Sequence, residues 1–103
     1  MVRVILEHKA KDTEKLIEVI REVRNEAMKQ QGYITGETLV NTEDPTNVLV
    51  ISTWDSLNDW RIWDSSEVRV QLKARINKLL TEPYTTRTFH YYLINHKGVR
   101  TIF

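Results

Sequence analysis

The residues best suited to chemistry are three tryptophans, Trp54, Trp60 and Trp63, which are all the tryptophan the chain has. A small domain rarely places so much aromatic surface in one segment without packing it into a core or around a ligand. Trp60 and Trp63 are one helical turn apart, so we expect both indoles on one side of a helix. Such a wall suits a flat aromatic or quinol substrate, although Trp63 is equally suited to filling the core. Trp54 ends an apolar run and is expected mainly to pack.

His8 is the candidate for proton transfer. It alternates with Val2 and Val4, which predicts that it lies on the core side of a strand. Its unperturbed pKa is near neutrality and suits removal of a proton from a phenol or quinol. The alternative is a partly exposed histidine at a strand end. His90 and His96 lie too far along the chain for the spacing to indicate a metal site.

Three further polar residues are candidates for substrate binding. Asn58 can direct its amide toward a pocket, or serve as an ordinary residue of a first helical turn. Tyr33 opens an expected strand and can donate a hydrogen bond to a substrate oxygen. Arg75 lies near the apolar face of an expected helix, where its guanidinium can meet an anionic group or its stem can lie along the surface.

Composition excludes several classes of protein. The chain has 103 residues, 41% hydrophobic and 28% charged, which is typical of one globular domain. The net charge of +1 argues against a nucleic-acid partner. The absence of cysteine removes disulfides and thiolate chemistry. There is no glycine-rich phosphate loop or nucleophile elbow, so we expect no cofactor. With no cysteine and with widely spaced histidines, we expect no metal. Arg3 interrupts the first apolar run, so we expect no signal peptide and no membrane partner, and a cytoplasmic protein.

Periodicity predicts the elements that must position these residues. Alternation predicts a strand over residues 2–8, and runs rich in β-branched, apolar or aromatic residues predict strands over 33–41, 48–54 and 84–94. Helical spacing predicts a helix that Asp12 or Thr13 caps and Gly32 follows. A second helix is predicted to begin at Ser56 and to be interrupted before a second cap at Ser65 or Ser66. It then continues to Pro83, and the residues on its apolar face are Val68, Leu72, Ile76 and Leu79. The fold class is therefore α+β: a ferredoxin-like β-α-β-β-α-β order with a split second helix and an antiparallel four-stranded sheet.

The expected sheet is apolar on both faces, and its helices can cover only one of them. Leu49 and Ile51 alternate with Val48 and Val50 in the third strand. A chain of this length has no second layer to offer, so we expect a homodimer whose two sheets face each other. We divide the chain into a domain over residues 1–94 and a tail over 95–103, whose apolar end is expected to reach the partner subunit.

Local motifs now support a family resemblance. The strand-ending Thr53-Trp54-Asp55-Ser56 is followed, nine positions after its tryptophan, by Trp63-Asp64-Ser65-Ser66-Glu67-Val68 and then by an apolar helix up to Leu79-Leu80 and Pro83. Over residues 2–94 the chain resembles the antibiotic biosynthesis monooxygenase family of dimeric α+β barrels. The resemblance implies a cavity between the split helix and the sheet, with Trp63 on its wall. The family that the chain resembles includes cofactor-free oxygenases of polycyclic aromatic substrates, quinol oxygenases and haem-degrading enzymes.

The haem-degrading branch fits poorly. It has an asparagine near the end of the first strand, where this chain has Glu7 or His8, and a histidine iron ligand where this chain has Lys73. A protonated lysine has no lone pair for iron. We therefore expect a small cofactor-independent monooxygenase acting on an aromatic, phenolic or quinol-type substrate in an apolar pocket, with His8 as base and Trp63 at the reaction site. The alternative is a non-catalytic dimeric protein that binds a small apolar ligand.

Overall fold

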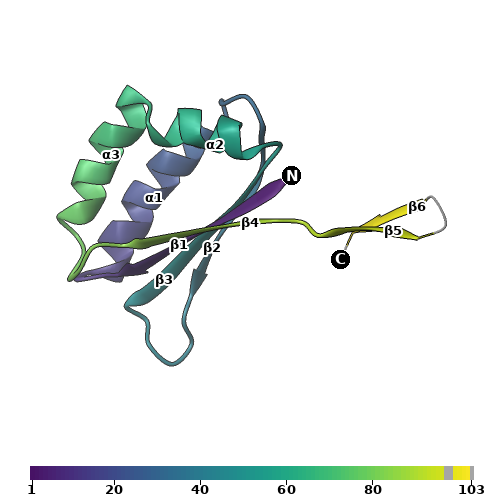
Figure 1. Cartoon of the computed structure of the whole chain (residues 1–103). Helices are drawn as coiled ribbons and strands as arrows, with labels where there is room; N and C mark the ends of the chain where they lie inside the picture. The colour runs from purple at the N-terminus through teal and green to yellow at the C-terminus, as the bar shows by residue number, and fades with distance from the viewer. Residues whose placement is uncertain (97–98, 103) are drawn as a thin grey trace.

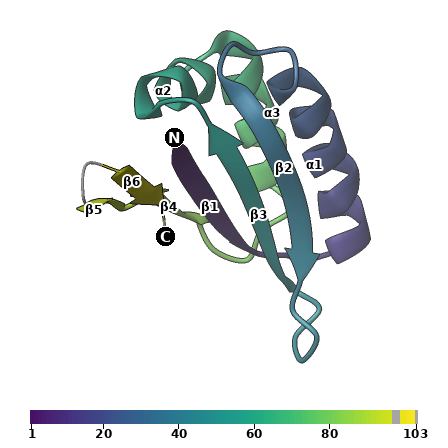
Figure 2. The same ribbon diagram turned by 90° about the vertical axis from the view of Figure 1, so that its right-hand side faces the viewer.

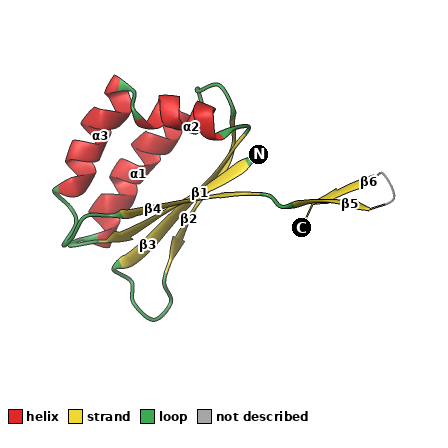
Figure 3. Cartoon of the chain, viewed as in Figure 1, coloured by secondary structure: helices red, strands yellow, loops and turns green. Residues whose placement is uncertain are grey.

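The structure is a computed structural model that describes residues 1–96 and 99–102, and side chains up to Tyr92. The body contains four strands and three helices, shown in Figures 1 and 3. In chain order these are β1 (Val2–Lys9), α1 (Thr13–Ala27), β2 (Tyr33–Val40), β3 (Asn47–Trp54), α2 (Leu57–Asp64), α3 (Glu67–Asn77) and β4 (Thr85–His90). The ferredoxin-like order with a split second helix is confirmed. Within the described residues, no helix is long and apolar enough to cross a membrane.

The four strands form one antiparallel sheet in the order β2-β3-β1-β4, with all three helices on one face (Figures 1 and 2). The register pairs Val4 with Ser52 and His8 with Val48 across β1 and β3. Because side chains alternate along a strand, these residues share the helix side of the sheet. Ile5 and its partner Ile51 share the opposite, outer side.

Side-chain caps decide where each helix begins. Asp12, Ser56 and Ser66 each accept the backbone N–H of the residue three positions on, which satisfies a donor that the first helical turn leaves free. Asp12 rather than Thr13 caps α1, and Ser66 rather than Ser65 caps α3. The cap at Ser66 separates α2 from α3 and lets the two helices take different directions over the sheet (Figure 3).

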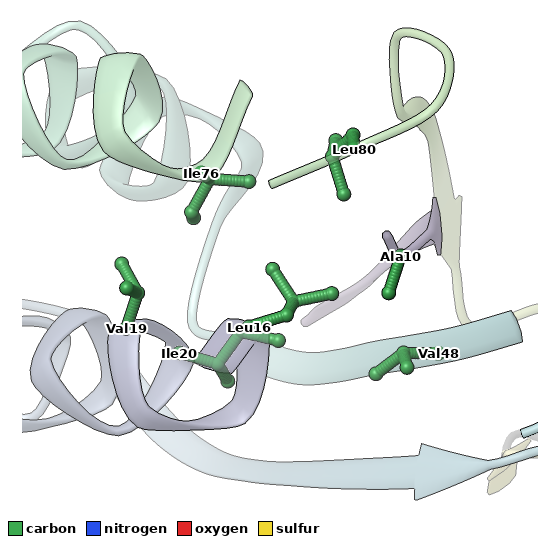
Figure 4. Close-up of a cluster of buried hydrophobic side chains, with 7 residues drawn as sticks. All are labelled: Ala10, Leu16, Val19, Ile20, Val48, Ile76 and Leu80. Carbon is green, nitrogen blue, oxygen red and sulfur yellow. The ribbon is translucent and has the colours of Figure 1, made fainter. Parts of the chain in front are cut away.

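Two clusters of buried apolar side chains join the helices to the sheet. In the first, Leu16, Val19 and Ile20 of α1 lie opposite Ile76 of α3 and beside Val48 of β3 (Figure 4). Ala10 and Leu80 close its end through a backbone bridge between their segments. The second contains Val2, Val4, Ala27, Trp54 and Trp63. Burying one side chain of valine, leucine or isoleucine size contributes about 1.5–3 kcal/mol, so these clusters are the main stabilising feature of the fold.

The strand expected over residues 84–94 is instead two strands. β4 ends at His90, which pairs with Val2, the first residue of β1. The chain then forms a separate hairpin of β5 (Leu93–His96) and β6 (Val99–Ile102), which projects away from the body in Figures 1 and 2. Residues 97, 98 and 103 of the expected tail lie outside the described residues.

Candidate functional site

A cavity lies between the helices and the sheet. Its walls come from α1, β1, β2, β3, α2 and α3. Four of its residues are aromatic: Tyr33, Trp54, Trp60 and Trp63. The space open to the centre of a water-sized sphere is about 40 Å³. The cavity as it stands therefore holds a few water molecules, and a ring system would have to displace wall side chains to enter it.

The two indoles predicted to share a wall do so. Trp63 is 4% exposed and belongs to the second core cluster, so the same side chain both packs the core and lines the cavity. Trp60, one turn earlier, is half-buried. Trp54, expected mainly to pack, also lines the cavity, and its Nε1 donates to Ser52 Oγ at 3.0 Å.

Tyr33 lies beside these indoles on the second strand. Its ring meets Trp54 edge to face, with 5.3 Å between the ring centroids and 90° between the planes. The Tyr33 hydroxyl lies where a Cβ on Gly36 would be, so a glycine at that position makes room for it. Tyr33 thus directs a hydroxyl group along the cavity wall.

Arg69 is a buried charged residue of the cavity wall that we did not predict. Its side chain is 2% exposed and lines the cavity from α3. The prediction placed Val68 on the buried face, but Val68 is 44% exposed. Arg69, Leu72 and Ile76 follow helical spacing and form the buried face instead. That spacing was readable in the sequence; the expectation that arginine stays in water hid it.

His8 is buried on the helix side of β1, with 1% exposure, and is not partly exposed. Its Nδ1 lies 3.1 Å from the Val48 carbonyl oxygen and its ring lies 5.2 Å from that of Tyr84. Burial lowers the pKa of His8; the hydrogen bond to Val48 raises it and the positive charge of Arg69 lowers it. The neutral imidazole donates from Nδ1 and leaves a lone pair on Nε2, which has no partner within the described residues. His8 does not line the cavity, whereas Leu6, the preceding inward-facing residue of β1, does line it.

Two other predicted site residues lie elsewhere. Asn58 is exposed in the first turn of α2. Arg75 is exposed on α3, and its guanidinium donates to both carboxylate oxygens of Glu22 at 3.1 and 2.6 Å. The structure therefore brings Tyr33, Trp60 and Trp63 together around the cavity, and it does not bring Asn58 or Arg75 to it. Across the described part of the chain, no three histidine, aspartate or glutamate side chains lie together as a metal site would require.

The sequence comparison settles the family. Residues 1–75 match the model of the antibiotic biosynthesis monooxygenase (ABM) family. The chain belongs to that family. No curated protein is similar enough in sequence to match it.

Solved structures share this ABM fold at low sequence identity. A conserved protein from Methanosarcina mazei Go1 has a TM-score of 0.80 and 13% identity, covering 85% of this chain and 89% of its own. SnoaB, a cofactor-independent oxygenase from Streptomyces nogalater, has a TM-score of 0.80 and 12% identity, covering 86% and 90%. Rv0793 from Mycobacterium tuberculosis has a TM-score of 0.77 and 14% identity, covering 86% and 92%. At these identities the likeness concerns the fold alone.

Proposed function

We propose that this ABM protein is a cofactor-independent monooxygenase that oxidises an aromatic, phenolic or quinol-type substrate in the cavity beneath Trp60 and Trp63. The observation that carries the proposal is a cavity walled by three tryptophans and a tyrosine in a member of this family. A neighbour in fold, SnoaB, is a cofactor-independent oxygenase. Flat rings stack on indoles, and burial among them excludes water from the reacting carbon.

The chemistry needs only a base and a dry pocket. Removal of a proton from an anthrone-type substrate gives an electron-rich anion that itself reduces O₂. The substrate methylene becomes a carbonyl; one oxygen atom enters the product and the other leaves in water, so the substrate supplies all the electrons. The protein's share is to orient the ring, to accept the proton and to stabilise the anion.

Substrate entry must enlarge the cavity. Its present 40 Å³ is far smaller than the 300–1,000 Å³ or so typical of ligand sites. Trp60 is half-buried and lies at the helix α2 end of the wall, so rotation of its indole opens the cavity with the smallest loss of core packing. Trp63, which is almost fully buried, stays as the fixed surface against which the ring stacks.

His8 is the proposed base. Its lowered pKa keeps the imidazole neutral at pH 7, and its Nε2 has a free lone pair. It lies one inward-facing position beyond Leu6, a residue of the cavity wall, so a substrate that reaches it must extend past Leu6. This geometry makes His8 testable as a base separately from the indole wall.

Oxygen uptake tests the proposal. Purified protein with an anthrone or quinol substrate and a metal chelator is expected to consume O₂ and to form the carbonyl product without added flavin. Trp63→Phe, which keeps an aromatic ring but shortens the wall, is expected to raise KM more than it lowers kcat. His8→Ala is expected to lower kcat about 10²-fold or more, in line with loss of a general base, while the exposed His90→Ala keeps the wild-type rate. No turnover across a substrate panel contradicts the proposal as a whole. An unchanged rate in His8→Ala contradicts the assignment of His8 as the base.

One observation favours the alternative, a non-catalytic binding protein. No carboxylate or imidazole is found on the cavity walls among the described residues. A pocket without a base at the ring binds a ligand but does not activate it. Tight binding of an aromatic ligand without oxygen uptake, over pH 6 to 9, would support binding alone.

We also propose that two copies associate through the outer face of the sheet. Ile5, Leu49 and Ile51 are only half-buried there, and Leu39 and Phe89 are 46% and 51% exposed. The register places Ile5 beside Ile51 and Leu49 beside Leu39, and partly exposed apolar side chains that adjoin in this way commonly mark an interface. Sedimentation is expected to give a dimer at micromolar concentration, and Ile51→Glu to give a monomer. Deleting residues 95–103 is expected to weaken the dimer; an unchanged dissociation constant would remove the tail from the interface.

A further inference from the structure

Arg69 is a buried cation with one nitrogen that no described residue hydrogen-bonds. Its side chain is 2% exposed, and its Nη1 has no hydrogen-bond partner within the described residues. The guanidinium carbon lies 6.0 Å from the centroid of the Tyr84 ring, at the outer limit of a cation–π contact. A buried donor left without an acceptor costs about 1–3 kcal/mol, and more when it is charged.

The carboxylate beside Arg69, Asp64, lies closer to a second cation than to Arg69. Asp64 Oδ1 lies 3.8 Å from Arg69 Nε, too far for a hydrogen bond. The same oxygen lies 2.8 Å from Lys73 Nζ, which also donates to the backbone oxygen of Asp64 at 2.7 Å. Two cations therefore share one carboxylate, and the closer one is Lys73.

The cavity that Arg69 lines has an excess of positive charge. Arg24 is a second guanidinium on its walls, and it donates to the Thr38 hydroxyl. No wall residue among those described is acidic. Burial lowers the pKa of Arg69 more than Tyr84 and Asp64 raise it, which agrees with a charge held away from water and only partly compensated. An enclosed space with two cations and no anion attracts a negatively charged group.

We propose that the ligand of the cavity is an aromatic carboxylate, whose carboxylate accepts a hydrogen bond from Arg69 Nη1 while its ring lies against Trp60 and Trp63. The inference shares the cavity with the proposed function, but it concerns ligand binding and does not require turnover. A carboxylate supplies both the acceptor and the charge that Arg69 lacks, and its planar fork matches a guanidinium. A bound water would satisfy the hydrogen bond but not the charge.

Matched ligands test the carboxylate directly. Quenching of tryptophan fluorescence gives the dissociation constants of 2-naphthoate and of its neutral analogue 2-naphthamide. Wild-type protein is expected to bind the carboxylate about 10- to 100-fold more tightly, the worth of one charge-assisted hydrogen bond. Arg69→Gln is expected to bind both ligands equally, with the affinity for the amide within about threefold of wild type. Arg21→Gln, at an exposed arginine of α1, keeps the preference.

A second variant separates ligand recognition from a structural role. Arg69→Met fills a similar volume without charge, and replacing a buried, poorly paired charge by an apolar side chain is often neutral or stabilising. We expect Arg69→Met to keep or raise the melting temperature of the ligand-free protein and to lose the preference for naphthoate. A large fall in melting temperature would show that Arg69 serves the fold, and would overturn the inference. So would equal binding of the two ligands by wild-type protein, or failure to bind naphthoate at all.

Binding and turnover fail independently. If the naphthoate preference depends on Arg69 but no aromatic carboxylate or quinol causes oxygen uptake, the carboxylate site stands and the monooxygenase does not. If neutral substrates are oxidised and wild-type protein binds naphthoate no more tightly than naphthamide, the monooxygenase stands and the carboxylate site does not.

Discussion

Acid should destabilise this protein through one buried imidazole. In the unfolded chain His8 takes up a proton near its ordinary pKa of 6.5; in the folded chain burial lowers that pKa. Below pH 6.5 the unfolded state therefore binds more protons, and the free energy of unfolding falls as the pH falls through this range. The loss at pH 5.5 is at most about 1.4 kcal/mol, the free energy of protonating one free imidazole, and the slope is at most about 1.4 kcal/mol per pH unit.

The surroundings of His8 allow this effect to be isolated. Val48 and Tyr84 contact the ring, and Arg69 adds a positive charge that opposes protonation. Glu22 and Asp44 also have lowered pKa values, caused mainly by hydrogen bonds from Arg75 and Thr46, but from ordinary values of 4.5 and 3.8. Their contributions are lost only at more acidic pH, so the range from pH 7.5 to 5.5 reports on His8.

His8→Asn is the informative variant, because its amide can still donate to the Val48 carbonyl but does not titrate. Urea unfolding between pH 7.5 and 5.5 should show a smaller dependence on pH than in wild type, and a loss of about 1–3 kcal/mol at pH 7.5 from the smaller side chain. His90→Gln, at an exposed histidine, should keep the wild-type slope. The reasoning is refuted if His8→Asn retains the full pH dependence.

Three further substitutions probe the framework of the site by urea unfolding. Trp63→Ala removes a side chain that is 4% exposed and should cost about 3–5 kcal/mol; a loss below 1 kcal/mol would mean that the indole is not core. Ser66→Ala should cost about 1 kcal/mol by removing the cap of α3, whereas Ser65→Ala should cost much less, and equal losses would contradict the assignment of the cap. Gly32→Ala should be destabilising by more than 1 kcal/mol, because φ is 86° there and a Cβ would meet the Asp59 side chain; a neutral result would show that the turn relaxes.

The body of the fold was predictable because its signals are local. Alternation located the inward residues of β1, and the serine caps located the start of α2 and, to within one residue, that of α3. The end of β4 was not predictable, because Tyr91 and Tyr92 have ordinary strand propensity. β4 ends at the residue paired with Val2, where β1 itself begins, and that position depends on the register between the two strands.

The site was predictable only in its aromatic part. The turn-apart spacing of Trp60 and Trp63 and the strand position of Tyr33 were enough to bring three rings together. Arg69 was missed because charge alone argues for the surface, and only the tertiary structure places it inward. The ion pair of Arg75 with Glu22 joins α3 to α1 over 53 residues of sequence, which no local pattern reveals.

The position of β1 in the sheet has a consequence for synthesis. β1 leaves the ribosome first, yet it lies in the interior of the sheet, bonded to β3 on one edge and to β4 on the other. Until residues 85–90 have emerged, a nascent chain displays the free backbone groups of β1 along one whole edge. An open edge of this kind is a template for pairing with a neighbouring chain. The interval after α3 has emerged and before β4 has emerged should therefore be the stage at which this polypeptide most needs a chaperone.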